Sequence, residues 1–235
     1  MTPTSANGGP GVVCGLADEA ALFRRHTAAA KVRCAGADAA VAGRLAVDLI
    51  AEGCAGVVSF GLAGGLDPGL SSGTLIIADG VADAAGHRIA TDAAWRERLM
   101  AALADAFGGG AIVGTVAGVE RPVLSPADKA ALRDRTGAAA VDLESGSIAT
   151  VAASHGVPFV VIRALADAAD RVVPAWAATC IGKEGRPRIG FILGALAADP
   201  RRVSELIGLA GDSRRGLATL RRAILFAGPS LQLDG

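Results

Sequence analysis

The sequence predicts an α/β protein built as a single domain, with three α/β/α layers around a central sheet that is mostly parallel but mixed. Short apolar runs that end in glycine alternate with stretches of helical periodicity along nearly the whole chain. The 235 residues are enough for one large core, and no Pro/Ser-rich or highly charged linker separates two halves. We therefore expect one domain over residues 1–235, with a flexible segment at residues 1–10.

The first part of the chain alternates between strands and helices. Asp18 and Glu19 open the first predicted helix, because acidic side chains are favourable at the positive N-terminal end of a helix dipole. Gly53 follows the second helix, where glycine commonly ends helices. The predicted order is strand 11–16, helix 18–30, strand 31–36, helix 38–52, and two strands within 55–81 around a glycine-rich turn.

The second part continues this alternation and ends in helices. A helix around Trp95 precedes a strand, and Ser125 with Pro126 matches an N-cap followed by proline at the first helical position. The stretch VDLESGSIATVAASHGVPFVVIRALADAAD predicts a short strand, a helix and a β-rich run. After an irregular loop, three helices are expected near residues 189–198, 201–209 and 214–226.

Composition and charge exclude several classes of protein. Basic and acidic residues balance at 23 each, which disfavours a nucleic-acid-binding face and favours a small-molecule partner. The four cysteines are scattered without metal-binding or disulfide spacing, so no metal is expected. The N-terminus lacks a signal-peptide pattern and no stretch has the roughly 18 apolar residues of a membrane span. We expect a cytoplasmic protein.

Acidic residues mark both ends of one helix–strand unit. Asp142 and Glu144 precede the helix, while Asp167 and Asp170 follow the β-rich run. The carboxyl ends of parallel strands are where open α/β sheets bind ligands, so these acids are candidate site residues.

The glycine-rich turn carries Gly61, Gly64 and Gly65. Glycine permits the close backbone approach that a loop around an anion or a sugar requires, although such clusters also make plain turns. The dinucleotide and P-loop patterns are both absent, which disfavours a dinucleotide or nucleoside triphosphate cofactor.

Three stretches together resemble the superfamily of purine nucleoside phosphorylases and methylthioadenosine/adenosylhomocysteine nucleosidases. They are GVVCGLADEA, SFGLAGGLDPGLSSGTLIIAD and VDLESGSIATVAASHGVPFVVIRALADAAD. The family signals are a glycine-ended first strand, a G-[ST]-A-G-G-L turn, an [ED]-M-E-[SA] element and a P-[FY]-x-x-[IV]-R-x-[ILV]-[SA]-D loop. Within the superfamily the chain looks most like the hopanoid-associated phosphorylase branch, which is assigned to releasing adenine from adenosylhopane.

The resemblance implies distinct roles for three acids. Asp167 matches the acid that serves N7 of the departing purine, and Glu144 matches the carboxylate that binds the ribose 2′ and 3′ hydroxyls. Glu19 lies near the position of a water-activating glutamate in nucleosidases and of a phosphate-binding arginine in some phosphorylases. Asp167 would need a raised pKa to act as the acid, from burial or from the neighbouring Asp170.

Other residues are expected around these acids. Asp142 has a structural or a substrate-linked role, and Arg163 is expected to stabilise the loop or to pair with an acid. Leu62 replaces the hydroxyl residue usual in the family's turn, which puts ordinary phosphate binding in doubt. The expected substrate-binding residues are Glu144, Leu143, Asp142, Gly64, Gly65, Phe159 and Trp176, with phosphate or loop support from Arg163, Arg44 and Gly15.

The resemblance thus predicts an enzyme that cleaves an adenine nucleoside, adenosylhopane above all. Phosphate is the potential co-substrate, or water acts in its place. No cofactor is expected. One alternative is a soluble nucleosidase for methylthioadenosine, adenosylhomocysteine or futalosine. Another is a non-catalytic binding protein for purine nucleosides. A homodimer or higher homo-oligomer is expected. The apolar helices within residues 189–235 favour core or dimer packing, or a transient membrane contact that reaches a lipid-tailed substrate.

Overall fold

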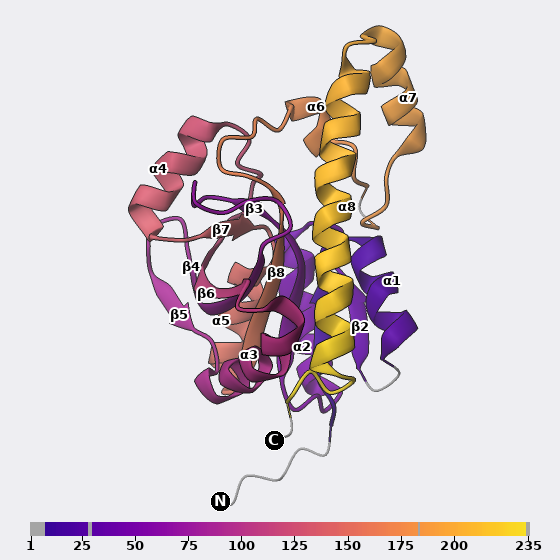
Figure 1. The fold of residues 1–235 in the computed structure, drawn as a ribbon. Helices are drawn as coiled ribbons and strands as arrows, with labels where there is room; N and C mark the ends of the chain where they lie inside the picture. Colours follow the sequence, from indigo (N-terminus) through magenta and orange to yellow (C-terminus); the bar gives the residue numbers. More distant parts are fainter. Residues whose placement is uncertain (1–7, 28–29, 183, 234–235) are drawn as a thin grey trace, which may run out of the picture.

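A mixed sheet of eight strands forms the centre of the computed structural model (Figure 1). The structure describes residues 8–27, 30–182 and 184–233, so most of the predicted flexible segment at residues 1–10 lies outside the described residues. The strands are β1 Gly11–Cys14, β2 Lys31–Cys34, β3 Val57–Gly65, β4 Leu75–Ala82, β5 Arg88–Ala90, β6 Ala111–Gly118, β7 Ala140–Asp142 and β8 Phe159–Asp167. The helices are α1 Ala17–His26, α2 Ala39–Ala51, α3 Ala93–Phe107, α4 Pro126–Thr136, α5 Ser145–His155, α6 Ala175–Ala178, α7 Ile189–Ala198 and α8 Arg202–Ala227.

The strand order closes part of the sheet on itself. The main path runs β2-β1-β3-β7-β6-β4-β5, and β8 pairs with both β3 and β4. Strands β3, β8, β4, β6 and β7 therefore form a ring. Most pairings are parallel, while β3–β7, β4–β5 and β4–β8 are antiparallel. The predicted mixed α/β sheet is confirmed, and the ring adds a closure that strand patterns do not reveal.

Alternate residues of the central strands enter two separate cores. Val12 and Val58 contact the cluster under α1, α3 and α8, whereas Val13 and Val57 contact the cluster under α2 and α5. Because side chains alternate between the two faces of a strand, a continuous apolar run indicates burial on both faces. This is the physical basis of the three-layer prediction.

Polar caps fix where several helices begin. Asp38 accepts a hydrogen bond from the Val41 N–H, and Asp92 accepts one from the Trp95 N–H. Ser125 caps α4 with Pro126 at the start of the helix, as predicted. Such caps each stabilise a helix by about 1 kcal/mol.

Four features differ from the predicted elements. The glycines of the predicted turn lie inside β3, and the short helix α6 lies in the predicted irregular loop. The edge strand β5 was not expected, and the helices predicted near 201–209 and 214–226 are one helix, α8. Within this helix, Gly216 permits close packing against β3 and β8. A Cβ on Gly216 would lie 2.5 Å from Leu62 Cδ2 and 3.2 Å from the Leu165 carbonyl oxygen. In the described residues, no helix combines the length and apolar character that crossing a bilayer requires.

Candidate active site

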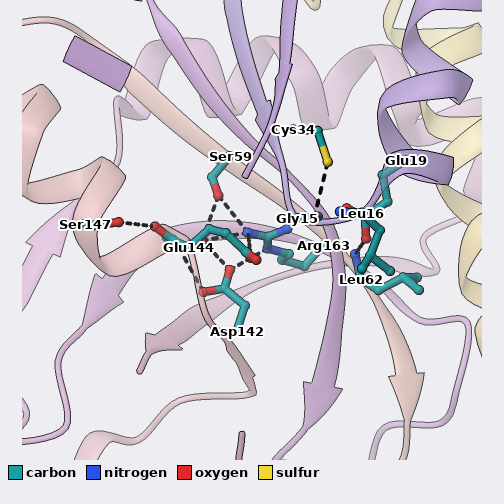
Figure 2. A network of polar contacts seen from close by, with 11 residues as sticks. Gly15, Leu16, Glu19, Cys34, Ser59, Leu62, Asp142, Glu144, Ser147 and Arg163 are labelled. Carbon is teal, nitrogen blue, oxygen red and sulfur yellow. Dashed lines mark hydrogen bonds and ion pairs between the residues drawn. The ribbon is translucent and has the colours of Figure 1, made fainter. Parts of the chain in front are cut away.

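Arg163 is the centre of a buried polar cluster at the middle of the sheet. Strand β8 carries this residue, and its side chain is fully buried. Its Nε donates to Asp142 Oδ2 at 2.5 Å, while Nη2 donates to Ser59 Oγ at 2.7 Å and contacts Glu144 Oε2 at 3.4 Å. Figure 2 shows the guanidinium between Asp142 and Glu144 on one side and Glu19 on the other.

Glu19 joins this cluster from the first turn of α1. Its two carboxyl oxygens accept the backbone N–H groups of Leu16 and Leu62, each at 2.8 Å. Glycine at position 61 makes room for the cluster, since a Cβ there would lie 2.5 Å from Arg163 Nη1 and 2.7 Å from Glu19 Oε2. The backbone of β3, rather than a side-chain hydroxyl, thus holds Glu19.

Glu144 is the carboxylate of the cluster with the most unused hydrogen-bonding capacity. It lies between β7 and α5, buried, and its salt bridge to Arg163 is 3.4 Å long. It packs over Gly15, where a Cβ would come within 2.5 Å of Glu144 Oε1. Gly15 therefore gives Glu144 its place, and the carboxylate oxygens remain able to accept hydrogen bonds from a ligand.

Asp142 has a structural role in the same cluster. Its Oδ1 accepts the Ser145 N–H at 3.0 Å, and its Oδ2 accepts the Ser145 hydroxyl as well as Arg163 Nε. Both oxygens are occupied within the protein, so Asp142 orients Arg163. Of the two roles left open from the sequence, the geometry supports the structural one.

Carboxyl groups outnumber cations in the cluster. Three carboxyl groups surround one guanidinium, and in the described part of the chain Arg163 is the only cation that forms a salt bridge with any of them. Burial raises the pKa of Glu144 to about 8 and also raises the pKa of Glu19, with Arg163 opposing both changes. Among the described residues, Arg163 Nη1 is a buried donor without a partner, so it can bind a ligand oxygen or a water.

Asp167 forms a second polar centre at the carboxyl end of β8. Lys129 of α4 is buried and donates to Asp167 Oδ2, to the Ala168 carbonyl at 2.9 Å and to the Arg171 carbonyl at 3.0 Å. Burial raises the pKa of Asp167 despite the opposing ammonium of Lys129. The carboxylate that adds to this increase is Asp212, whereas the sequence had suggested Asp170.

The two centres lie along the same pair of strands. Glu19 and Arg163 meet β3 at Gly61 and Leu62, while Asp167 pairs with Gly64. Three residues along a strand correspond to about 10 Å. The arrangement therefore offers a ligand two chemically different ends, an acid with a raised pKa at one and a carboxylate–guanidinium cluster at the other.

Several predicted residues join these centres. Leu143 is half-buried between Asp142 and Glu144. A Cβ on Gly65 would lie 2.8 Å from the Asp167 carbonyl oxygen, and one on Gly64 would lie 3.6 Å from its carboxyl oxygens. These glycines lie within β3 and not in the predicted turn, and they permit close approach of this strand to Asp167. The predicted contact of the glycines with an anion or a sugar stays a prediction.

Three other predicted residues lie elsewhere. Phe159 begins β8, eight residues or about 26 Å from Asp167, and it is buried in the core under α2 and α5. Its predicted contact with substrate is wrong, because the motif residue sits at the opposite end of the strand. Trp176 donates its indole N–H to Glu205 at 3.0 Å. Arg44 is exposed on α2 and forms no ion pair with the described residues.

A cavity of about 530 Å³ adjoins the Asp167 end of the site. It lies between the loop after β8 and the first half of α8, and Asp170, Arg171 and Glu205 are among the residues that line it. In the described residues, no group of three or more His, Cys, Asp or Glu side chains has the arrangement of a metal site.

Comparison with protein families gives one assignment. The model of the Phosphorylase superfamily matches residues 34–180, which include β3, β7, β8 and all the residues of the two polar centres except Gly15 and Glu19. A search of curated protein sequences gave no significant match.

Comparison with solved structures gives several neighbours of the same fold. Futalosine hydrolase of Helicobacter pylori has a TM-score of 0.68 and 16% identity, over 94% of this chain and 98% of the other. A 5′-methylthioadenosine/S-adenosyl homocysteine nucleosidase of H. pylori has a TM-score of 0.70 and 16% identity, over 92% and 95%. The corresponding nucleosidase of Neisseria meningitidis has a TM-score of 0.65 and 20% identity, over 92% and 99%.

Proposed function

Because the chain belongs to the phosphorylase superfamily, we propose that it cleaves the N-glycosidic bond of an adenine nucleoside and releases adenine. The observation that carries this proposal is that Asp167, an acid with a raised pKa, lies on β8 together with Arg163, around which Glu144 and Glu19 gather. Loss of a purine needs a proton at the base and a stabilised positive charge at the sugar, and the two centres provide these separately.

The roles of the residues follow from the chemistry. Glu144 accepts hydrogen bonds from the 2′ and 3′ hydroxyls, and its ionised form, which a pKa of about 8 makes the minor form at neutral pH, stabilises the oxocarbenium-like ribose as the C1′–N9 bond breaks. Asp167 donates its proton to the departing base at N7. A water attacks C1′ and gives a proton to Glu19, whose raised pKa makes it a stronger base than an exposed glutamate.

Water is the acceptor that the charges of this cluster favour. A phosphate dianion beside Glu19 and Glu144 would meet two carboxyl groups and only one guanidinium, which already binds Asp142. The unpaired Arg163 Nη1 can instead orient a neutral water towards Glu19. The Leu62 side chain, which packs towards α8 at Gly216, adds no hydroxyl donor for phosphate.

The proposed substrate is adenosylhopane, in hopanoid biosynthesis at the cytoplasmic side of the membrane. The sequence resemblance to the hopanoid-associated branch supports this choice, as does the exposed apolar helix α7, whose preceding segment packs against Gly15. A soluble nucleosidase for methylthioadenosine, adenosylhomocysteine or futalosine is the second candidate, which the fold of the H. pylori and N. meningitidis enzymes favours. A homo-oligomer and the absence of a cofactor are part of the same proposal.

A panel of nucleosides tests the reaction and the substrate together. The purified chain is mixed with adenosylhopane in detergent, methylthioadenosine, adenosylhomocysteine and futalosine, with and without phosphate, and the released base is measured by chromatography. We expect adenine release, fastest with adenosylhopane, at a rate that phosphate does not change and with the free sugar as product. Detection of a phosphorylated sugar as the product would mean that phosphate, and not water, is the acceptor. If no base is released from any nucleoside, the non-catalytic binding protein is favoured.

A further inference from the structure

Helix α7 is apolar on every side, yet most of it is exposed. Its sequence, IGFILGALAA, contains no polar side chain. Ile189 and Leu193 are 63% and 62% exposed, Phe191 is 39% exposed, and Ala195 alone is buried. At 3.6 residues per turn, the exposed residues cover an arc of about 200°. A helix that is apolar all round is normally buried, so this exposed surface indicates a partner.

The exposed apolar surface continues into the neighbouring elements. Val203 and Ile207 lie one turn apart on α8 and are 43% and 67% exposed, and Val172 in the loop after β8 is 59% exposed. Helix α7 and the first turns of α8 form a hairpin that projects beyond the sheet, at the end of the molecule opposite the C-terminal end of α8 (Figure 1). Contiguous exposed apolar surface of this kind is typical of interaction sites.

Basic residues flank both ends of α7. Arg186 and Arg188 precede the helix and Arg201 follows it, all exposed, while Arg202 is half-buried. The guanidinium of Arg188 lies 5.2 Å from the centroid of the Phe191 ring, so this charge sits at the edge of the apolar surface. Three acids, Glu184, Asp199 and Glu205, accompany these four arginines in residues 184–207. An apolar face edged by arginine fits a surface with an apolar interior and anionic headgroups.

The segment that leads into α7 packs directly on the candidate site. The Gly185 carbonyl accepts the Ala17 N–H at 3.0 Å, and the Glu184 carbonyl lies 3.6 Å from Cys34 Sγ. A Cβ on Gly185 would come within 2.8 Å of the Gly15 carbonyl oxygen. Gly15 is the residue over which Glu144 lies, so α7 is joined to the sugar end of the site by a few residues.

From these observations we infer that the hairpin of α7 and the first turns of α8 docks on an anionic lipid bilayer. Ile189, Phe191 and Leu193 enter the acyl boundary and the flanking arginines remain among the headgroups. A second copy of the chain is a poorer match. In a two-fold symmetric contact, the arginines of one copy would face the arginines of the other, and the like charges would repel. Docking rests on the proposed function in one respect: it would bring the site to a substrate whose tail stays in the lipid. Vesicle binding itself can be measured without any substrate.

Vesicle flotation of the full chain tests this inference. We expect the wild type to float with vesicles of phosphatidylcholine and phosphatidylglycerol and to bind pure phosphatidylcholine far more weakly. Ile189→Ser with Leu193→Ser should lower the bound fraction about tenfold or more. Arg186→Gln with Arg188→Gln should lower binding to the anionic vesicles only. The matched control is Leu225→Ser with Phe226→Ser, at the other end of α8, where the side chains are 53% and 50% exposed; it should bind as the wild type does.

Three results would overturn the inference. The first is that the wild type floats with neither kind of vesicle. The second is that the control variant loses as much vesicle binding as the Ile189/Leu193 variant. The third is that the chain binds no vesicles and sediments as a dimer, which the Ile189/Leu193 variant alone disrupts. Adenine release from methylthioadenosine is measured in parallel without lipid. The Ile189/Leu193 variant should retain whatever rate the wild type shows there, so failure of docking and failure of the proposed reaction are separate outcomes.

Discussion

At the scale of single residues, Lys129 shows how the protein controls Asp167. The ammonium group makes three hydrogen bonds, to the carboxylate and to two carbonyls of the following loop. These bonds fix the position of Asp167. The ammonium of Lys129 favours the ionised form of Asp167, whereas burial favours the protonated form, which is the form that a proton donor needs. We expect substrate binding to alter this balance, because a ligand in the site excludes more water from Asp167.

Removal of Lys129 tests its positioning role. Lys129→Met leaves a buried carboxylate and two carbonyls without their donor, and we expect the free energy of unfolding to fall by roughly 3–5 kcal/mol. The pKa of Asp167 should rise further, which moves the corresponding limb of the pH profile of kcat to higher pH. Denaturant titration and pH–rate profiles measure the two effects. Arg135→Gln, at an exposed position of the same helix, should change the stability by less than about 0.5 kcal/mol.

Glu144 predicts a pH dependence of stability. The pKa of this buried group is about 8 in the folded chain, whereas an exposed glutamate has a pKa of about 4.3. Between these values the folded chain keeps a proton that the unfolded chain has lost, so this group makes the wild type less stable as the pH rises. Glu144→Gln should therefore be more stable than the wild type near pH 9, by roughly 1–3 kcal/mol, with a smaller difference near pH 5. The free energy of unfolding of both proteins is measured as a function of pH. A difference between them that does not change from pH 5 to pH 9 would mean that Glu144 is ionised over this whole range.

The sequence predicted the acids of the site but not the residues that hold them. Asp167, Glu144 and Glu19 could be found because each follows a recognisable strand or turn. Lys129 could not, since it lies in PADKAALRDRT, a stretch whose charges resemble those of a solvated helix. Only the fold brings α4 against the loop after β8. Ser59 and Ser145 were missed for the same reason, and Phe159 was misplaced because a motif does not specify which end of a strand bears the ligand.

At the scale of elements, α8 depends on two glycines with different surroundings. Gly216 faces Leu62 and the Leu165 carbonyl at close range, whereas a Cβ on Gly211 would meet nothing within 4 Å. Both glycines are inside one helix, so the gain in helix propensity from alanine, about 1 kcal/mol, is common to both substitutions.

This pair supplies an internally controlled prediction. Gly211→Ala should stabilise the chain by about 0.5–1 kcal/mol, and Gly216→Ala should be less stable than Gly211→Ala by about 1–3 kcal/mol because it crowds β3 and β8. Chemical denaturation of the two variants and the wild type measures the difference. If both variants gain stability equally, α8 does not pack against the sheet at Gly216.

The same glycines explain where the sequence-based prediction of the fold fell short. A run such as IGLAGDSRRG reads as a helix break because glycine and aspartate lower helix propensity. In the folded chain, close packing against β8 outweighs that preference. The buried strands were predictable from their two-sided apolar pattern, but the ring of β3, β8, β4, β6 and β7 was not, since it arises from pairings between distant segments.

At the scale of the whole molecule, the ring of strands joins the two polar centres into one candidate site. Strand β8 carries Arg163 and Asp167, β3 carries the glycines that make room for them, and α5 follows the β7 end at which Glu144 lies. The segment that leads into α7 packs against Ala17, next to the Gly15 over which Glu144 lies. The central claim is that these centres act together, with Asp167 serving the base and Glu144 the ribose.

The most direct test is the rate of adenine release by Asp167→Asn compared with that of the wild type, at saturating nucleoside and in buffer without phosphate. We expect kcat to fall about 10²–10⁴-fold, as for loss of a general acid, while KM changes far less. Asparagine has nearly the same shape and still accepts from Lys129, so the fold should persist, as circular dichroism would show. Adenine release by the folded variant at the rate of the wild type would contradict the account.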